Sequence, residues 1–257
     1  MKNELLTIGP VTLYGYGLMI AIGVIAAYVS AEYRAKRKNL NPDLIFNLTI
    51  WCLAGGILGA KLLYYITQIE DIIANPKVLL DVSNGFVVYG GIIGGIFAGF
   101  LFCIKKKFNF LQYFDLVMPS IALAQGFGRL GCFLAGCCYG RETNSFLGII
   151  FHESNYAPNG VRLIPTQLLS SGLDFLHFFV LIMLAKRVKA DGQIAGFYLI
   201  FYSAGRFILE FFRGDLIRGT VGSLSTSQFI AIILFIIGWG IVLVRGYSAR
   251  KISEKQA

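Results

Sequence analysis

Seven apolar segments of about the length that crosses a membrane, the last of them short, constrain the fold of this chain more than any other feature. They cover Leu13–Ala31, Ile45–Ile66, Phe86–Ile104, Leu111–Leu134, Leu168–Ala185, Ile194–Phe212 and Phe229–Val244. A helix of about 20 apolar residues spans the hydrocarbon core. Only 14% of the residues are charged, against roughly 25% in soluble domains. We therefore predict an all-α integral membrane protein with seven transmembrane helices, forming a single transmembrane domain over residues 1–257.

Basic residues lie mainly on one side of this seven-span arrangement. More than half of the 23 lysines and arginines fall in segments 32–44, 105–110, 186–193 and 245–257. Loops rich in Lys and Arg stay in the cytoplasm, so the N-terminus is expected outside and the C-terminus in the cytoplasm. The first span is expected to be retained, because its basic flank follows it. The net charge of +9 is explained by topology and anionic lipid, and no nucleic-acid partner is expected.

Two arginines fall inside predicted spans, where a charged side chain is costly. Arg129 lies in the fourth span and Arg206 in the sixth. An arginine in hydrocarbon costs at least about 2.5 kcal/mol and cannot shed its proton. Glu210 is four residues after Arg206, on the same helix face, and could neutralise it. Arg129 has no acidic residue at helical spacing. The uncompensated positive charge predicts an internal site for an anion such as a phosphate.

The third span begins with glycines spaced four residues apart. The steps are Gly90/Gly94, Gly91/Gly95 and Gly95/Gly99. Such spacing permits close packing of two helices, which is the simpler interpretation. Glycines next to Tyr89 could in addition let a lipid headgroup approach the backbone amides.

Three of the five cysteines cluster at the end of the fourth span. Cys132, Cys137 and Cys138 are most simply interpreted as small residues at a helix end. A disulfide is an open alternative, although a bridge between Cys137 and Cys138 would be strained. A zinc site would need the distant His152 as its fourth ligand and lacks the usual CxxC spacing. No metal site is therefore expected.

The run around Arg129 has a recognisable form, Gly126-Phe-Gly-Arg-Leu-Gly-Cys-Phe-Leu-Ala-Gly-Cys-Cys-Tyr-Gly-Arg141. It resembles the signature of bacterial prolipoprotein diacylglyceryl transferases. Four further segments agree with this family in order and spacing, from about residue 10 to residue 245. They are Tyr16-Gly-Leu-Met19, Tyr89-Gly-Gly-Ile-Ile-Gly94, Pro165-Thr-Gln-Leu168 and the helical face of Tyr202, Arg206 and Glu210.

The resemblance implies a transferase of the bacterial cytoplasmic (inner) membrane, crossing it several times. It would move the diacylglyceryl group of phosphatidylglycerol to the lipobox cysteine of an exported prolipoprotein, the first step of lipoprotein maturation. Glycerol phosphate would leave and a thioether would form. The expected partners are phosphatidylglycerol, the prolipoprotein signal peptide and the lipid bilayer. No metal or organic cofactor is expected.

Residue roles carry over only where the motifs match. The catalytic residues implied are Arg129, Arg206, Glu210 and Tyr89. The substrate-binding residues implied are Arg129, Tyr16, Gly90, Gly91, Gln167 and Tyr202. The two arginines would stabilise the charge that develops on the leaving phosphate, and Glu210 would orient Arg206 and could relay a proton.

The chain departs from the family's pattern at several positions. Tyr89 stands where the family has a histidine, Cys132 where it has an asparagine, and Cys137 where it has a glutamate. Leu169-Ser170 replaces a tyrosine-glutamate pair. Because a neutral phenol is a weak base at pH 7, Tyr89 is expected to hydrogen-bond the lipid headgroup, or to act as a base only with the help of the arginines.

Two other functions remain open from the sequence. A relative of the transferases could act on a different thiol or lipid, which the missing histidine and glutamate favour. An anion or lipid transporter could also use internal arginines, but the chain shows no inverted repeats and no paired broken helices.

Overall fold

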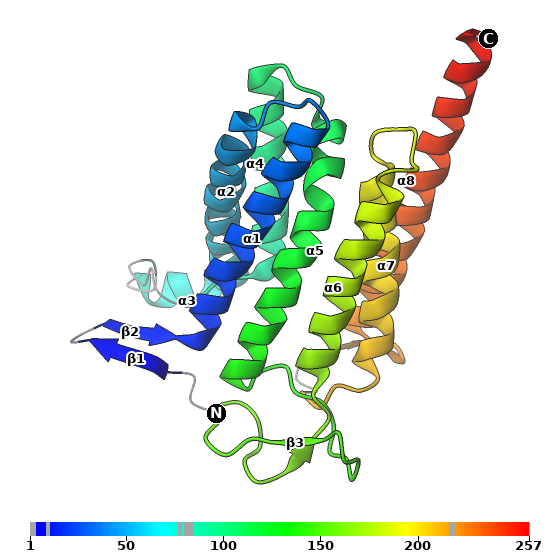
Figure 1. Ribbon diagram of the computed structural model, residues 1–257. Coiled ribbons are helices and arrows are strands. Elements are labelled where there is room, and N and C mark those ends of the chain that lie inside the picture. The colour runs from blue at the N-terminus through cyan, green and yellow to red at the C-terminus, as the bar shows by residue number, and fades with distance from the viewer. Residues whose placement is uncertain (1–3, 9–10, 77–78, 80–84, 216–218, 257) are drawn as a thin grey trace. The chain divides into compact units, whose positions relative to one another are not determined.

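The computed structural model describes residues 4–8, 11–76, 79, 85–215 and 219–256 and is mostly helical (Figure 1). The helices are α1 (Gly15–Arg37), α2 (Asp43–Thr67), α3 (Ile69–Ala74), α4 (Val88–Lys106), α5 (Phe110–Ala135), α6 (Thr166–Leu184), α7 (Gln193–Glu210) and α8 (Thr226–Gln256). The predicted helical class is thereby confirmed.

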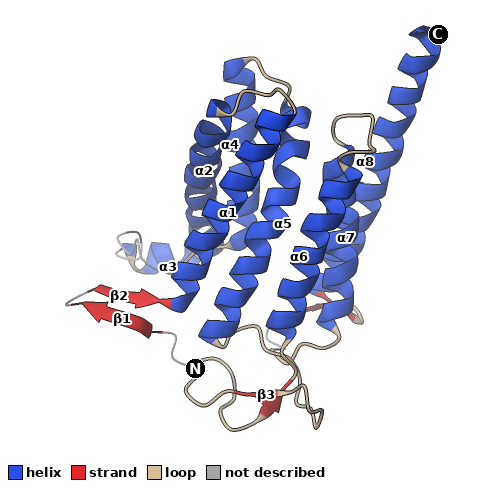
Figure 2. Ribbon diagram, in the orientation of Figure 1, coloured by secondary structure: helices blue, strands red, loops and turns tan. Residues whose placement is uncertain are grey.

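Short strands accompany the helices in the described part of the chain (Figure 2). The described strands form separate antiparallel pairs, each made of two strands that are consecutive in the sequence. The pairs are β1 (Glu4–Ile8) with β2 (Val11–Tyr14), β3 (Ile149–Ile150) with β4 (Arg162–Leu163), and β5 (Thr220–Val221) with β6 (Leu224–Ser225). Neither these pairs nor the short helix α3 was predicted, because segments this short carry little periodicity.

Six helices are long and apolar enough to cross a membrane, judged on the described residues: α1, α2, α4, α5, α6 and α8. The remaining expected span, 194–212, forms α7, whose 18 residues include Arg206 and Glu210. These charges lower its mean hydropathy, and α7 is not among the six. The structure therefore supports six spans by length and composition. The seventh span and the orientation of the termini stay predictions.

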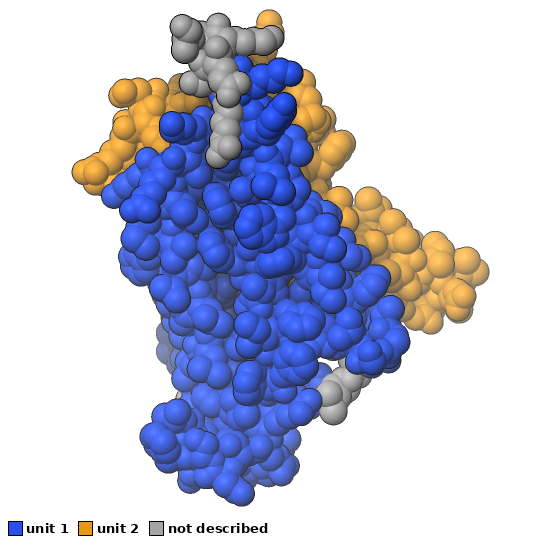
Figure 3. All heavy atoms as spheres, turned by 90° about the vertical axis from the view of Figure 1, so that its right-hand side faces the viewer, with its two compact units in different colours: residues 1–31, 114–257 blue, residues 32–113 orange. Residues whose placement is uncertain are grey.

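The chain divides into two compact units, coloured separately in Figure 3. The first unit comprises Met1–Ala31 and Phe114–Ala257, and the second comprises Glu32–Tyr113. Helices α1 and α5 each contribute to both units. The single domain expected from the sequence stays a prediction.

In the second unit, α2 and α4 pack backbone against backbone. The glycines at the start of α4 face Gly55 and Gly59 of α2. A Cβ atom added at Gly94 would lie 2.9 Å from Gly59 Cα and closer still to Gly55 O. The backbone N–H of Val87, just before α4, also donates to Ala60 O at 3.1 Å. The glycine spacing thus serves close helix packing, the simpler of the two interpretations of the sequence.

In the first unit, α5, α6 and α7 share an apolar core. Met118 and Ala122 of α5, Leu181 of α6 and Ile194 and Tyr198 of α7 are its buried residues, together with Ala195. Helix α8 packs along α7, where Gly196 and Gly238 approach each other closely. The α1 residues of this unit contact α5 in the same way, at Gly23 beside Phe127.

Asp115 of α5 caps the beginning of α7. Its two carboxylate oxygens accept hydrogen bonds from the backbone N–H groups of Gly192, at 2.7 Å, and Ala195, at 2.9 Å. The first N–H groups of a helix have no partner within it, and a carboxylate there also interacts favourably with the helix dipole. The side chain is 7% exposed, so α5 and α7 are joined by a buried polar contact.

Removing this cap is expected to destabilise the first unit. Asp115→Ala leaves two buried N–H donors without an acceptor, which costs about 1–3 kcal/mol. Asp115→Asn keeps one carbonyl oxygen and should lose less. Thermal unfolding of the purified protein in detergent would measure both variants, and an unchanged melting temperature for Asp115→Ala would contradict the capping role.

Candidate functional site

A cavity of about 480 Å³ lies in the first unit between α6 and α7, with one residue of α5 in its wall. Most of the wall is apolar: Leu173, Leu176, Val180, Phe201, Gly205, Ile208 and Leu209. The polar lining residues are Arg129, Ser170, Asp174, His177, Tyr202 and Arg206. This size suits a small organic ligand or part of a lipid. The two arginines singled out from the sequence therefore line one cavity.

Arg206 is held by an ion pair on its own helix. Its Nη2 atom lies 2.7 Å from Glu210 Oε2 and 2.9 Å from Ser227 Oγ of α8. The side chains of Arg206 and Glu210 are 13% and 9% exposed. The pairing expected from the four-residue spacing is therefore confirmed. Because Glu210 and Ser227 fix one side of the guanidinium, its remaining donors can face the cavity.

Arg129 of α5 lines the cavity. It is the arginine for which the sequence shows no acidic residue at helical spacing. Among the described residues it forms no ion pair with a carboxylate within 4.0 Å. Asp174 of α6 lines the same cavity and lies within electrostatic range of it. Two guanidinium groups therefore share the cavity with one lining carboxylate, Asp174, while Glu210 pairs with Arg206, so these four charges sum to zero. A phosphate is favoured here by the several N–H donors of the guanidinium groups and not by a surplus of positive charge.

Two ionisable cavity residues were missed by the sequence analysis. Asp174 and His177 are three residues apart on α6, inside the fifth expected span. His177 is 7% exposed, its ring stacks on Tyr198 at 5.0 Å between centroids, and its Nε2 has no hydrogen-bond partner among the described residues. An acidic residue in the middle of a span is itself a signal of function, and that signal could have identified Asp174.

The other predicted residues of the first unit lie at varying distances from the cavity. Tyr202 lines it, with its ring stacked parallel to that of Tyr198 at 5.9 Å. Tyr16, at the start of α1, does not line it but packs beside Gly131 of α5. It remains within electrostatic range of Arg129.

Gln167 has a different environment from the one expected. It is 1% exposed, and its Nε2 donates to the backbone oxygen of Cys137 at 2.8 Å. The neighbouring Thr166 donates its hydroxyl to Cys138 O, also at 2.8 Å. These bonds tie the segment after α5 to the start of α6. Gln167 is not part of the cavity wall, and its role in substrate binding stays a prediction.

Three predicted residues, Tyr89, Gly90 and Gly91, belong to the second unit, at the start of α4. Tyr89 is 50% exposed, whereas Gly90 packs against Gly59 of α2. Their contribution to the same site as the arginines stays a prediction from the sequence.

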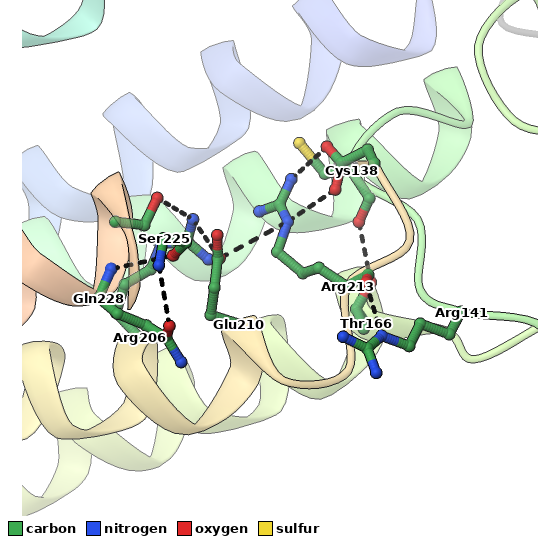
Figure 4. A network of polar contacts seen from close by, with 10 residues as sticks. Cys138, Arg141, Thr166, Arg206, Glu210, Arg213, Ser225 and Gln228 are labelled. Atoms are coloured by element: carbon green, nitrogen blue, oxygen red, sulfur yellow. Dashed lines mark hydrogen bonds and ion pairs between the residues drawn. The ribbon is translucent and has the colours of Figure 1, made fainter. Parts of the chain in front are cut away.

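A second arginine network, also missed, adjoins the cavity residues (Figure 4). Arg213, just after α7, donates from Nε to Asp215 Oδ1 at 2.8 Å, pairs through Nη2 with the other carboxylate oxygen, and lies 3.9 Å from Glu210 Oε2. Burial acts to lower the pKa of Arg213, but the hydrogen bond with Asp215 raises it above the ordinary value overall. Arg141 donates from Nε to Arg213 O at 3.2 Å. The segments that follow α5 and α7 are thus joined close to Glu210, the partner of Arg206.

These features define a membrane protein with several apolar helices and an arginine-lined cavity. The chain belongs to the prolipoprotein diacylglyceryl transferase family, whose model matches residues 3–244. The family assignment made from the motifs is therefore confirmed, and with it the class of enzyme, a transferase.

Curated relatives agree over nearly the full length of the chain. A phosphatidylglycerol–prolipoprotein diacylglyceryl transferase of Clostridium tetani is 50% identical over 93% of this chain and 95% of its own. A Clostridium perfringens protein with the same name and the number 2 is 46% identical over 95% of this chain and 93% of its own. One from Finegoldia magna is 35% identical over 93% of each chain.

Proposed function

We propose that this protein transfers the diacylglyceryl group of phosphatidylglycerol to the lipobox cysteine of a prolipoprotein. The thiol sulfur forms a thioether with the glyceryl carbon, and glycerol phosphate leaves. The observation that carries the proposal is the cavity shared by Arg129 and Arg206. The names of the relatives, which act on phosphatidylglycerol and prolipoprotein, support the choice of both substrates.

The cavity meets both chemical demands of such a donor. Its apolar wall suits the acyl portion of the lipid, while the guanidinium groups of Arg129 and Arg206 suit the phosphate. The leaving group gains negative charge as the carbon–oxygen bond breaks, and fixed cations in a site of low dielectric stabilise that charge most effectively. Glu210 and Ser227 would hold Arg206 in the position from which it stabilises this charge. The hydroxyl of Tyr202 would offer the lipid headgroup a further hydrogen bond.

A direct assay tests the proposal. Purified protein is incubated with phosphatidylglycerol vesicles and a peptide containing a lipobox cysteine, and the peptide is analysed by mass spectrometry. A mass increase of one diacylglyceryl group, absent for the same peptide with serine in place of cysteine, is the expected result. Lipid consumption without a modified peptide would instead indicate a different acceptor. Flux of phosphate esters through liposomes, with no covalent product, would indicate a transporter.

Tyr89 is proposed to hydrogen-bond the lipid headgroup. Tyr89→Phe removes only the hydroxyl, and one hydrogen bond to a charged group contributes about 1.5–3 kcal/mol, so lipidation should fall about 10- to 100-fold. Tyr89→His restores a polar side chain and should retain part of the activity. A wild-type rate of peptide lipidation by Tyr89→Phe would show that the hydroxyl is irrelevant.

The protein is further proposed to cross the bacterial cytoplasmic membrane seven times as one domain, with α7 as the additional span. The N-terminus would be outside and the C-terminus inside, as the basic segments favour. Alkaline phosphatase fused after residue 215 should be active, because that end of α7 would be outside, while a fusion after residue 189 should be inactive. The reverse pattern would overturn the orientation.

A further inference from the structure

Three thiols meet at the end of α5. Cys132 lies in the last turn of the helix, and Cys137 and Cys138 follow just beyond it. Their three Sγ atoms all lie within 4.8 Å of one another. All five cysteines of the chain are described, and none forms a disulfide.

The backbone is bent to bring these thiols together. After α5 ends, Gly136 adopts φ +75° and Cys138 adopts φ +60°. A non-glycine residue in the left-handed region is uncommon and costs of order 1 kcal/mol, so it points to function when the surroundings enforce it. They do so here: Cys137 N–H donates to Cys132 O at 3.1 Å, and α6 holds the carbonyl groups of Cys137 and Cys138 through Gln167 and Thr166.

Positive charge surrounds the three sulfur atoms. The guanidinium of Arg213 interacts electrostatically with the side chain of Cys138. Arg129 lies within electrostatic range of Cys132 and Cys138. A divalent metal bound by three thiolates carries a net charge of about −1, which nearby arginines would offset. Hydrogen bonds to ligating sulfur also orient and tune such sites.

We propose that Cys132, Cys137 and Cys138 bind one Zn²⁺ whose fourth coordination position is taken by the thiol sulfur of the substrate cysteine. Zinc–sulfur bonds of about 2.3 Å in a tetrahedral site require sulfur atoms about 3.8 Å apart. The observed limit of 4.8 Å therefore needs a contraction of about 1 Å at most. The described residues offer no fourth His, Cys, Asp or Glu to this group. Three protein ligands with one exchangeable position are typical of catalytic zinc.

The expectation of no metal rested on the need for His152 as a fourth ligand and on the missing CxxC spacing. A coordination position left open for the substrate removes the first objection, and the observed proximity of the three Sγ atoms answers the second. The proposal rests on the proposed function, because the fourth ligand is the acceptor cysteine.

Such a site would supply the nucleophile for the proposed reaction. On binding zinc, the substrate thiol loses its proton to solvent and becomes a thiolate. Its electron pair forms the carbon–sulfur bond to the glyceryl carbon, the carbon–oxygen bond breaks, and the released pair stays on the phosphate oxygen. An ordinary thiol, with a pKa near 8.5, is only about 3% ionised at pH 7. Coordination would raise that fraction by up to about 30-fold without a basic side chain.

The first experiment measures metal rather than activity. Full-length protein is purified in detergent under reducing conditions, with zinc supplied and excess removed, and its metal content is determined by mass spectrometry. One zinc per chain is expected for the wild type and for the control variants Cys52→Ser and Cys103→Ser. Each of Cys132→Ser, Cys137→Ser and Cys138→Ser should lose it. Cobalt in place of zinc should give a thiolate-to-metal charge-transfer band that these three variants lack.

The second experiment separates this proposal from the proposed function. Chelation should lower peptide lipidation by wild-type protein at least about 10-fold, and added zinc should restore it. Arg129→Ala should keep its zinc and lose lipidation. Zinc-free wild type, or an intact mass showing a disulfide among the three cysteines, would overturn the site. Full activity after complete removal of bound zinc would overturn its role with the substrate thiol. Bound zinc in a protein that forms no thioether would instead count against the proposed function.

Discussion

Arg129→Ala and Arg206→Ala should each reduce thioether formation by at least about 100-fold, the usual effect of removing one group that stabilises developing charge. Both arginines line the cavity, and neither can replace the other because they enter it from different helices. Arg206→Lys should also be impaired, since an ammonium keeps the charge but lacks the planar, forked donors with which the guanidinium can contact Glu210 and Ser227 and still bind a phosphate through two N–H groups.

A matched control removes the same charge elsewhere. Arg187→Ala changes an exposed arginine in the loop after α6 and should lipidate peptide at the wild-type rate. Protein levels in the membrane should be equal for all variants. If Arg129→Ala or Arg206→Ala fully replaced the wild type in cells lacking transferase activity, the assignment of the cavity to the phosphate would be wrong.

Gly94→Leu should prevent the second unit from forming. The new side chain would clash with the backbone of α2 at Gly55 and Gly59. Backbone atoms within a helix cannot move aside as the end of a side chain can. Overpacking of a fitted interface costs about 1–3 kcal/mol and more where backbone must shift. Gly240→Leu is the matched control, because a Cβ there meets nothing within 4 Å.

The measurement is the yield of monodisperse protein in size-exclusion chromatography after a temperature series. The monodisperse peak of the Gly94→Leu variant should disappear at temperatures where the peaks of the Gly240→Leu variant and the wild type remain. Equal survival of the two leucine variants would show that α2 and α4 do not depend on their glycine contact.

Features that lie within one helix could be predicted from the sequence. The apolar segments located the long helices, because length and apolarity are local properties of the chain. Glu210 was paired correctly with Arg206, since residues four apart share a helix face. The glycine steps of α4 predicted close packing, although they could not name α2 as the partner.

Features that join different helices could not be predicted in this way. Asp174 lines the cavity beside Arg129 from α6, and nothing in helical spacing says which helices face each other. The amide of Gln167, in α6, donates to the backbone carbonyl of Cys137 beyond α5, and no feature of the sequence indicated this contact. The convergence of three thiols depends on left-handed backbone at Gly136 and Cys138, and a cysteine in that conformation has no sequence signal.

The capping of α7 by Asp115 also bears on how the chain is assembled during synthesis. Helix α7 is not among the six helices that are apolar enough to cross a membrane by composition, and a segment carrying Arg206 and Glu210 would partition poorly into lipid by itself. Helix α5, made earlier, already presents the carboxylate that α7 needs at its first turn. The ribosome would thus synthesise α5, with its capping carboxylate, before it synthesises α7. In nascent chains halted before α8, α7 should be inserted in the membrane less stably than in complete chains. The reason is that α8 supplies Ser227, which accepts a hydrogen bond from Arg206.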